Sequence, residues 1–152
     1  MTTFAYTQNN DQSALHEAVP PYYGKQDDSV AARVDLIRRG IPFAMFKQVR
    51  EESPFSLEEW AVFLDISLKS LQRYIKDTSH VFKASHTEKI IEIGEVLSLG
   101  HEVFGDLDKF YTWCTRENLT LGGHTPLDLI RDSYGKQWVM DELHRIDHGV
   151  FA

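Results

Sequence analysis

The sequence LGGHTPLDL, residues 121–129, decides how the last third of this chain folds. Gly122 and Gly123 interrupt the apolar pattern at a point where a positive φ costs little. Thr125 is a preferred N-cap residue, and Pro126 fits the first helical position because that position needs no N–H donor. The stretch therefore predicts a tight turn followed by a short, capped helix.

A second helix is predicted to follow from about Tyr134 and to end near Gly149, a favourable residue for a helix stop. Its apolar side chains recur at helical spacings of one, four and three residues. These side chains are Trp138, Val139, Leu143 and Ile146. On the residues alone, the two helices form either an ordinary hairpin that completes a core or a surface for a partner.

Residues 57–76 have the pattern of a helix-turn-helix, in which the second helix crosses close to the first. Ala61 is the small residue needed at the crossing, and Leu71 can pack back against it. Asp65 stands at the sharp turn, where Gly is usual. The second helix would expose side chains that suit base edges and phosphates, namely Ser67, Lys69, Ser70, Gln72, Arg73 and Lys76.

This pattern leaves two interpretations open. The motif could bind DNA, and a dimer that reads a palindrome is then expected because one copy would bind weakly. It could also be a helical hairpin of the same shape without a role in DNA binding.

The rest of the chain is read as all-helical, because it has neither strand-like alternation of useful length nor an internal repeat. Ser56 with Glu59 and Ser85 with Glu88 each predict a capping box at a helix start. Residues 1–28 are polar and lack an apolar period, so they predict a flexible arm.

Composition and charge narrow the function classes. The 152 residues include 42% hydrophobic residues and carry a formal charge of −7. Residues 31–85 hold nine Lys and Arg against seven Asp and Glu, whereas residues 86–152 hold six against twelve. An acidic protein is a poor non-specific nucleic-acid binder, so a DNA contact is expected in the positive segment. The acidic end suits a basic protein partner, although a charged face can also simply be solvated.

No apolar run approaches the about 18 residues of a membrane span, and no secretory signal is visible, so a cytoplasmic location is expected. Cys114 cannot form an internal disulfide and is interpreted as a small core residue. No metal, cofactor or catalytic residue is expected. His144 and His148 have metal-binding spacing but no third ligand nearby. Trp60, Trp113 and Trp138 are expected to be core anchors.

Residues 86 to 152 resemble the toxin-binding domain of the Xre/MbcA/ParS antitoxin family. The elements that carry the resemblance occur in the family's order: VFGD at residues 103–106, Trp113, the 121–129 turn, and a last helix ending in Gly149, Val150 and Ala152. The resemblance implies an all-α fold, with an Xre-like helix-turn-helix domain over residues 29–84 and a toxin-binding domain over residues 85–152.

The resemblance also implies a function. The chain would be the antitoxin of a type II RES–Xre toxin–antitoxin pair. Its partner would be a RES-domain toxin that consumes NAD or transfers ADP-ribose from it, and the antitoxin would block that enzyme by direct contact. It would also dimerise and repress its own operon through the helix-turn-helix.

In this family the end of the chain lies against the toxin's catalytic cleft. A cleft for an anionic dinucleotide should be electropositive, so Glu142, Asp147 and the terminal carboxylate could mimic phosphates while Val150 and Phe151 fill apolar surface. Phe151 could instead fold back onto its own core. The resemblance carries the contact onto Glu142, Arg145, Ile146, Asp147, Gly149, Val150, Phe151 and Ala152.

Two other protein classes compete with this interpretation. A stand-alone helix-turn-helix regulator would bind an operator without any toxin partner. A pure inhibitor would have lost DNA binding, which the negative charge and Asp65 favour.

Overall fold

The computed structural model describes residues 30–149, and each named element in that range is a helix, which confirms the all-α prediction. The predicted arm, residues 1–28, lies outside the described residues, as do residues 150–152. The elements are α2 (Val30–Arg39), α3 (Phe43–Glu51), α4 (Leu57–Phe63), α5 (Leu68–Lys76), α6 (Ala84–Phe104), α7 (Leu107–Cys114), the 3₁₀ turn η1 (Leu119–Leu121), α8 (Pro126–Leu129) and α9 (Ser133–Asp147).

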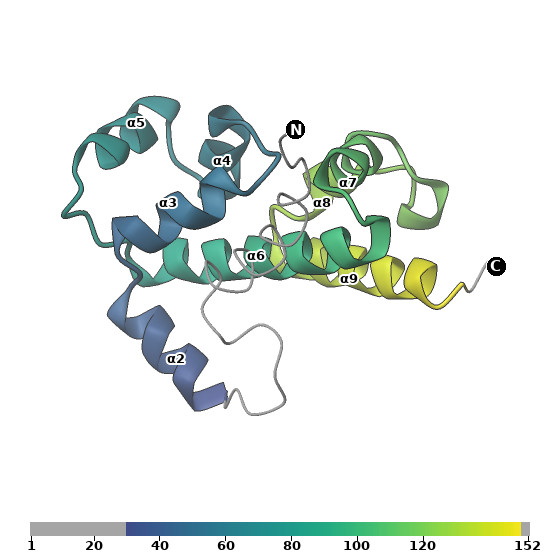
Figure 1. Ribbon diagram of the computed structural model, residues 1–152, viewed down its shortest axis with the longest axis horizontal. Helices are drawn as coiled ribbons and strands as arrows, with labels where there is room; N and C mark the ends of the chain where they lie inside the picture. The colour runs from purple at the N-terminus through teal and green to yellow at the C-terminus, as the bar shows by residue number, and fades with distance from the viewer. Residues whose placement is uncertain (1–29, 150–152) are drawn as a thin grey trace, which may run out of the picture.

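The long helix α6 is the axis of the molecule (Figure 1). In that view α3, α4 and α5 lie above its first half, α7 and α8 lie above its second half, and α2 lies below its beginning. Helix α9 packs along α6 and runs in the same direction, since Glu92 accepts a hydrogen bond from Ser133 and Glu95 pairs with Lys136 one turn further on. Such a central helix must be apolar on several sides, and α6 buries Ile90, Ile91, Ile93, Val96, Leu97 and Leu99.

Local capping signals set most helix starts. Ser56 and Glu59 form the predicted capping box, with bonds of 3.1 Å from the Glu59 N–H to Ser56 Oγ and 2.8 Å from the Ser56 N–H to Glu59 Oε2. Thr125 caps α8 by accepting from the Asp128 N–H, and Pro126 follows at the first turn as predicted.

The capping box predicted at Ser85 and Glu88 is wrong. Helix α6 begins at Ala84, and its N-cap residue, Lys83, makes no side-chain capping bond. A tertiary contact explains the difference. The buried Thr87 hydroxyl donates to the Phe82 carbonyl and accepts from the Ile41 N–H, each at 3.1 Å, which fixes this end of α6 independently of Ser85.

A single apolar core joins the two halves of the molecule. Phe55, in the loop before α4, packs with edge-on ring geometry against Phe110 of α7, with centroids 6.4 Å apart. Gly100 permits the close approach of α7 to α6, because a Cβ there would lie 2.5 Å from the Phe110 ring. The two halves therefore form one packed body.

The three tryptophans and Cys114 were predicted to lie in the core, and the structure confirms this for some of them only. Trp60 and Cys114 are fully buried, and burial raises the pKa of the Cys114 thiol well above its usual range. Trp113 is partly buried against the core. The prediction that Trp138 is a core anchor is wrong, since 43% of this residue is exposed.

Across residues 30–149, none of the helices is long and apolar enough to cross a membrane.

Candidate functional site

The α4–α5 pair has the geometry predicted for a helix-turn-helix. Ala61 and Leu71 are buried where the helices meet. Asp65 adopts a positive φ of 53°, and the Ile66 N–H donates to the Ala61 carbonyl at 3.0 Å to close the turn. Ser67 caps α5 by accepting from the Ser70 N–H. The sharp turn therefore forms with Asp in the position where Gly is usual.

One face of α5 is exposed and basic. Its residues Lys69, Gln72, Arg73 and Lys76 are exposed, and the first turn of the helix carries no acidic residue. The Arg73 guanidinium lies over the Tyr74 ring, 5.5 Å from its centroid, which limits the positions of that side chain. Such a face can contact phosphates and base edges.

Ser67 and Ser70, the two serines predicted to contact DNA, differ in exposure and bonding from the residues of this basic face. Ser67 is exposed, but its side chain caps the helix, and its hydroxyl also donates to Ser70 Oγ at 2.9 Å. Ser70 is only partly exposed. These two residues therefore shape the start of α5 as well as lying beside its basic face.

The other candidate surface is the end of α9, where Glu142, the residue predicted to mimic a phosphate, is already bonded within the chain. Glu142 is buried, and its Oε1 accepts from Thr120 Oγ1 at 2.8 Å and from Arg145 Nη2 at 2.6 Å. Arg145 Nε also donates to Oε2 at 2.9 Å. The hydrogen bonds from Arg145 are the main reason that the pKa of Glu142 lies below its usual range. Within this chain, Glu142 anchors Arg145 and η1.

The other residues predicted to contact the toxin lie at the end of α9 and after it. Ile146 is partly buried, and Asp147 and Gly149 are exposed. Gly149 adopts a positive φ of 66° directly after the helix, as expected for a stop residue. The other three predicted contacts, Val150, Phe151 and Ala152, lie outside the described residues. The structure therefore places Glu142, Arg145, Ile146 and Asp147 on the last two turns of α9, and Gly149 shortly after them.

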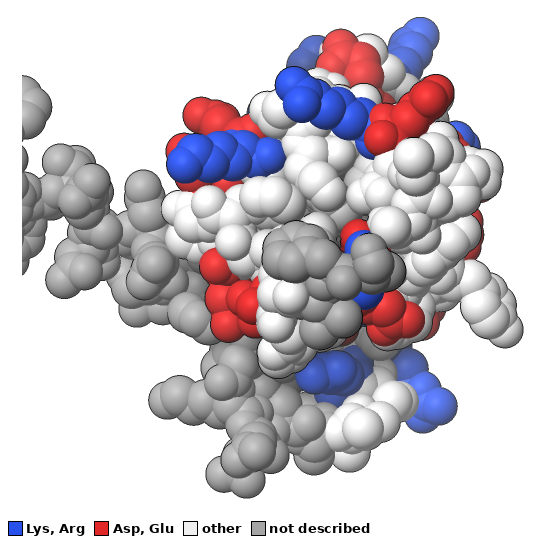
Figure 2. Space-filling model, turned by 90° about the vertical axis from the view of Figure 1, so that its right-hand side faces the viewer, with Lys and Arg blue, Asp and Glu red and all other residues white. Residues whose placement is uncertain are grey.

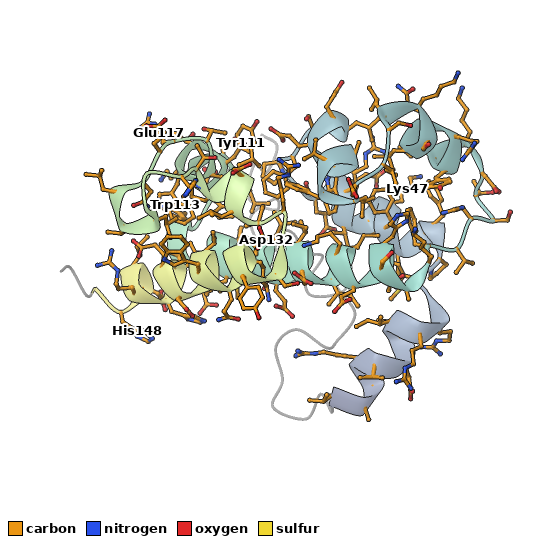
Figure 3. All side chains as sticks on the ribbon, turned by 180° about the vertical axis from the view of Figure 1, so that it is seen from behind. Lys47, Tyr111, Trp113, Glu117, Asp132 and His148 are labelled. Atoms are coloured by element: carbon orange, nitrogen blue, oxygen red, sulfur yellow. The ribbon has the colours of Figure 1, made fainter. Side chains whose placement is uncertain are left out.

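Histidines and acids near this end do not gather into a cluster. The His144 and His148 rings lie with centroids 6.4 Å apart. His148 projects from the end of α9, away from the side on which Tyr111 and Trp113 lie (Figure 3). No group of three or more His, Cys, Asp or Glu residues that could hold a metal ion occurs between residues 30 and 149.

Two features of these surfaces were not predicted. Thr120 bonds to Glu142 from another element, which no local pattern signals. Tyr134 and Trp138 are exposed one helical turn apart on α9. The spacing of four residues between two aromatic side chains is visible in the sequence, but Trp138 also fits an apolar period, which predicts a core position.

A helix-turn-helix unit joined through a shared helix to a smaller helical domain defines the class of this protein. Comparison with known families supports both parts. Residues 32–93 match the family model of the antitoxin Xre-like helix-turn-helix domain, and residues 99–149 match that of the antitoxin Xre/MbcA/ParS C-terminal toxin-binding domain. The chain is also 25% identical over 118 residues to a protein named Antitoxin Xre from Photorhabdus laumondii subsp. laumondii. The aligned stretch covers 77% of this chain and 79% of that relative.

The chain belongs to the Xre/MbcA/ParS antitoxin family. It is an Xre-family antitoxin with a helix-turn-helix domain and a toxin-binding domain, so a toxin is its protein partner. The two matched ranges meet inside α6, whereas the predicted boundary between residues 84 and 85 falls at the start of that helix.

Proposed function

We propose that this antitoxin neutralises a RES-domain toxin, an enzyme that consumes NAD or transfers ADP-ribose from it. The end of α9 and the residues that follow it would block the toxin's catalytic cleft. The observation that carries the proposal is the exit of the chain from α9 at the exposed pair Asp147 and Gly149, next to an arginine held by a buried carboxylate.

The residues of this end take different roles in the proposed contact. Asp147 supplies negative charge to a cleft that binds an anionic dinucleotide, and Val150 and Phe151 supply apolar area. Glu142 acts through Arg145, because its own oxygens are already bonded within the chain. Ile146 and Ala152 complete the contact.

We also propose that the antitoxin represses its own operon as a homodimer. The exposed Gln72 and Arg73 would read base edges, and Lys69 and Lys76, with Ser67 and Ser70 beside them, would contact phosphates. Two copies are needed because one recognition helix reads only a half-site.

Co-expression with the product of the adjacent gene tests the first proposal. The expected result is a stable complex and preserved cellular NAD, against loss of NAD when the partner is expressed alone. Removal of residues 149–152 should weaken the complex and restore toxicity. Unchanged neutralisation by that truncated chain would contradict the proposed role of the end. If no adjacent product forms a complex or is toxic, the stand-alone regulator becomes the better interpretation.

An operator-binding measurement tests the second proposal. Arg73→Ala should weaken binding to the promoter DNA of the operon by about 5- to 150-fold, the usual cost of a lost arginine–guanine contact. Arg116→Ala is the matched control, because Arg116 is also an exposed arginine but lies after α7, far from α5 in the chain. Equal operator binding by wild type and Arg73→Ala would contradict the proposed role of Arg73, and no operator binding by either protein would favour a pure inhibitor.

A further inference from the structure

Three large apolar residues are exposed on the toxin-binding domain, on α9 and the neighbouring turn η1. Tyr134 is 92% exposed, Trp138 is 43% exposed and Leu119 is 93% exposed. Tyr134 and Trp138 are four residues apart on α9 and so share one face of the helix. Leu119 begins η1, and its carbonyl accepts from the N–H of Gly122, which lies against the Trp138 ring. We call these three residues the α9–η1 patch.

The Trp138 ring is held in position by the glycine turn. Gly122 adopts a φ of 66°, and a Cβ there would lie 3.2 Å from Trp138 Cη2. The indole therefore packs on the backbone of the turn with one part and leaves a large part open to solvent. An exposed aromatic side chain that is already ordered loses little conformational freedom when a partner covers it.

The patch is continuous with the end of α9. Residues 134, 138, 141 and 145 follow one another at helical spacing, and Arg145 lies one turn before Gly149. The bond from Thr120 to Glu142 fastens η1 to the same stretch of α9. Figure 2 looks onto this end of the molecule, where uncharged side chains cover a broad area with charged groups around it.

The size of a stable protein interface requires more than the chain end. Specific complexes use about 20 residues or more on each side, whereas the contact proposed above for the end of α9 comprises only eight residues. A toxin contact made by the end alone would therefore be too small, and it must extend onto the folded part of the domain. The α9–η1 patch supplies the kind of residues that carry binding energy, since tyrosine and tryptophan are enriched at the centres of interfaces.

We propose that the α9–η1 patch is a second contact surface for the cognate toxin, with Trp138 as its anchor. The occupant is the toxin rather than a second copy of this chain, because the patch continues directly into the end that the proposed function places in the toxin's cleft. This inference rests on that proposed function. It adds a surface outside the cleft that determines affinity, while the chain end blocks the reaction.

Binding measurements with full-length antitoxin and the purified product of the adjacent gene test this surface. Trp138→Ala should raise the Kd by about 30-fold or more, which corresponds to the about 2 kcal/mol of an interface hot spot. Tyr134→Ala should raise it by about 5-fold. Val81→Ala is the matched control, since Val81 is an exposed apolar residue outside the toxin-binding domain, and its Kd should equal that of wild type.

Circular dichroism of each variant separates binding from folding. Trp138 touches Gly122, so its removal can disturb the turn, but Tyr134 is almost fully exposed and its variant should fold as wild type. Weaker binding by folded Tyr134→Ala and Trp138→Ala, with unchanged Val81→Ala, supports the patch.

Three results would overturn the inference. Wild-type affinity for the toxin in both patch variants would show that the patch does not contact the toxin, and it would leave the proposed function unaffected. A patch variant that turns a dimer into a monomer but binds the toxin normally would show that the patch joins two copies. Absence of binding by the wild-type chain would overturn the proposed function and the patch together.

Discussion

At the residue scale, Glu59 shows how one side chain serves two parts of the fold. Its Oε2 accepts the Ser56 N–H and caps α4, and its Oε1 accepts the Tyr111 hydroxyl from α7 at 2.7 Å. That hydrogen bond is the main reason that the pKa of Tyr111 lies above its usual value. The carboxylate thus ties the helix-turn-helix to the toxin-binding half at the point where α4 begins.

His80 and His86 should make the free energy of unfolding depend on pH. The His80 ring stacks on Tyr74 with centroids 3.9 Å apart, and burial is the main cause that lowers the pKa of both histidines below 6.5. The unfolded chain therefore binds more protons below about pH 6.5, so the free energy of unfolding should fall as the pH drops from 7.5 to 5.5.

Urea unfolding across this pH range measures the effect. His80→Phe retains an aromatic ring on Tyr74 but cannot take up a proton, so its unfolding free energy should depend less steeply on pH. His144→Gln, which removes an exposed histidine, is the control and should behave as wild type. A His80→Phe slope equal to that of wild type would contradict the assignment.

The residues that sequence reasoning placed correctly have partners close by in the chain. Ser56 and Glu59 are three residues apart, and the caps at Ser67 and Thr125 act over three residues as well. The bond that ties Glu142 to η1 could not be predicted, because its partner Thr120 is 22 residues away on another element. Trp138 was misjudged because an apolar period does not reveal how far the glycine turn covers its ring.

At the element scale, the turn between α4 and α5 determines how the basic face of α5 is presented. Asp65 is the one non-glycine residue with a positive φ between residues 30 and 149. Left-handed backbone costs an ordinary residue about 1–2 kcal/mol, and a β-branched side chain fits it worst. Asp65→Val should therefore lower the free energy of unfolding by about 1–2 kcal/mol, whereas Asp65→Gly should be at least as stable as wild type.

Thermal unfolding of the two Asp65 variants measures this cost. Asp65→Asn serves as the control, because Asn has a similar size and tolerates the same backbone region. If Asp65→Val and Asp65→Gly were equally stable, the strain argument would not hold. Operator binding should weaken in Asp65→Val in parallel, because a changed turn moves α5 relative to α4.

Helix α6 shows why element ends are harder to predict than element existence. The helix ends at its C-cap Gly105, which has a φ of 72°, a conformation that glycine adopts easily. Its start was misplaced because Thr87 bonds to residues 41 and 82, which are brought together only by the folded chain.

At the scale of the whole molecule, α6 belongs to both functional halves. Lys136 of α9 pairs with Glu95 of α6, which also lies 3.8 Å from Arg33 of α2. Burial is the main cause that lowers the pKa of Lys136, and the nearby carboxylate of Glu92 opposes this effect. The helix-turn-helix and the toxin-binding domain are therefore parts of one packed body.

This arrangement predicts that the helix-turn-helix half is not stable without α6. A fragment ending at residue 84 would leave the buried Ile41 N–H without the Thr87 hydroxyl and would expose the fully buried Phe82. Its far-UV circular dichroism should be that of a largely unfolded chain, whereas a fragment ending at residue 105 should regain helical signal. The full chain should unfold in a single transition, with coincident circular dichroism and tryptophan fluorescence. A cooperative thermal transition in the fragment ending at residue 84 would show instead that the predicted boundary between residues 84 and 85 separates two independent folding units.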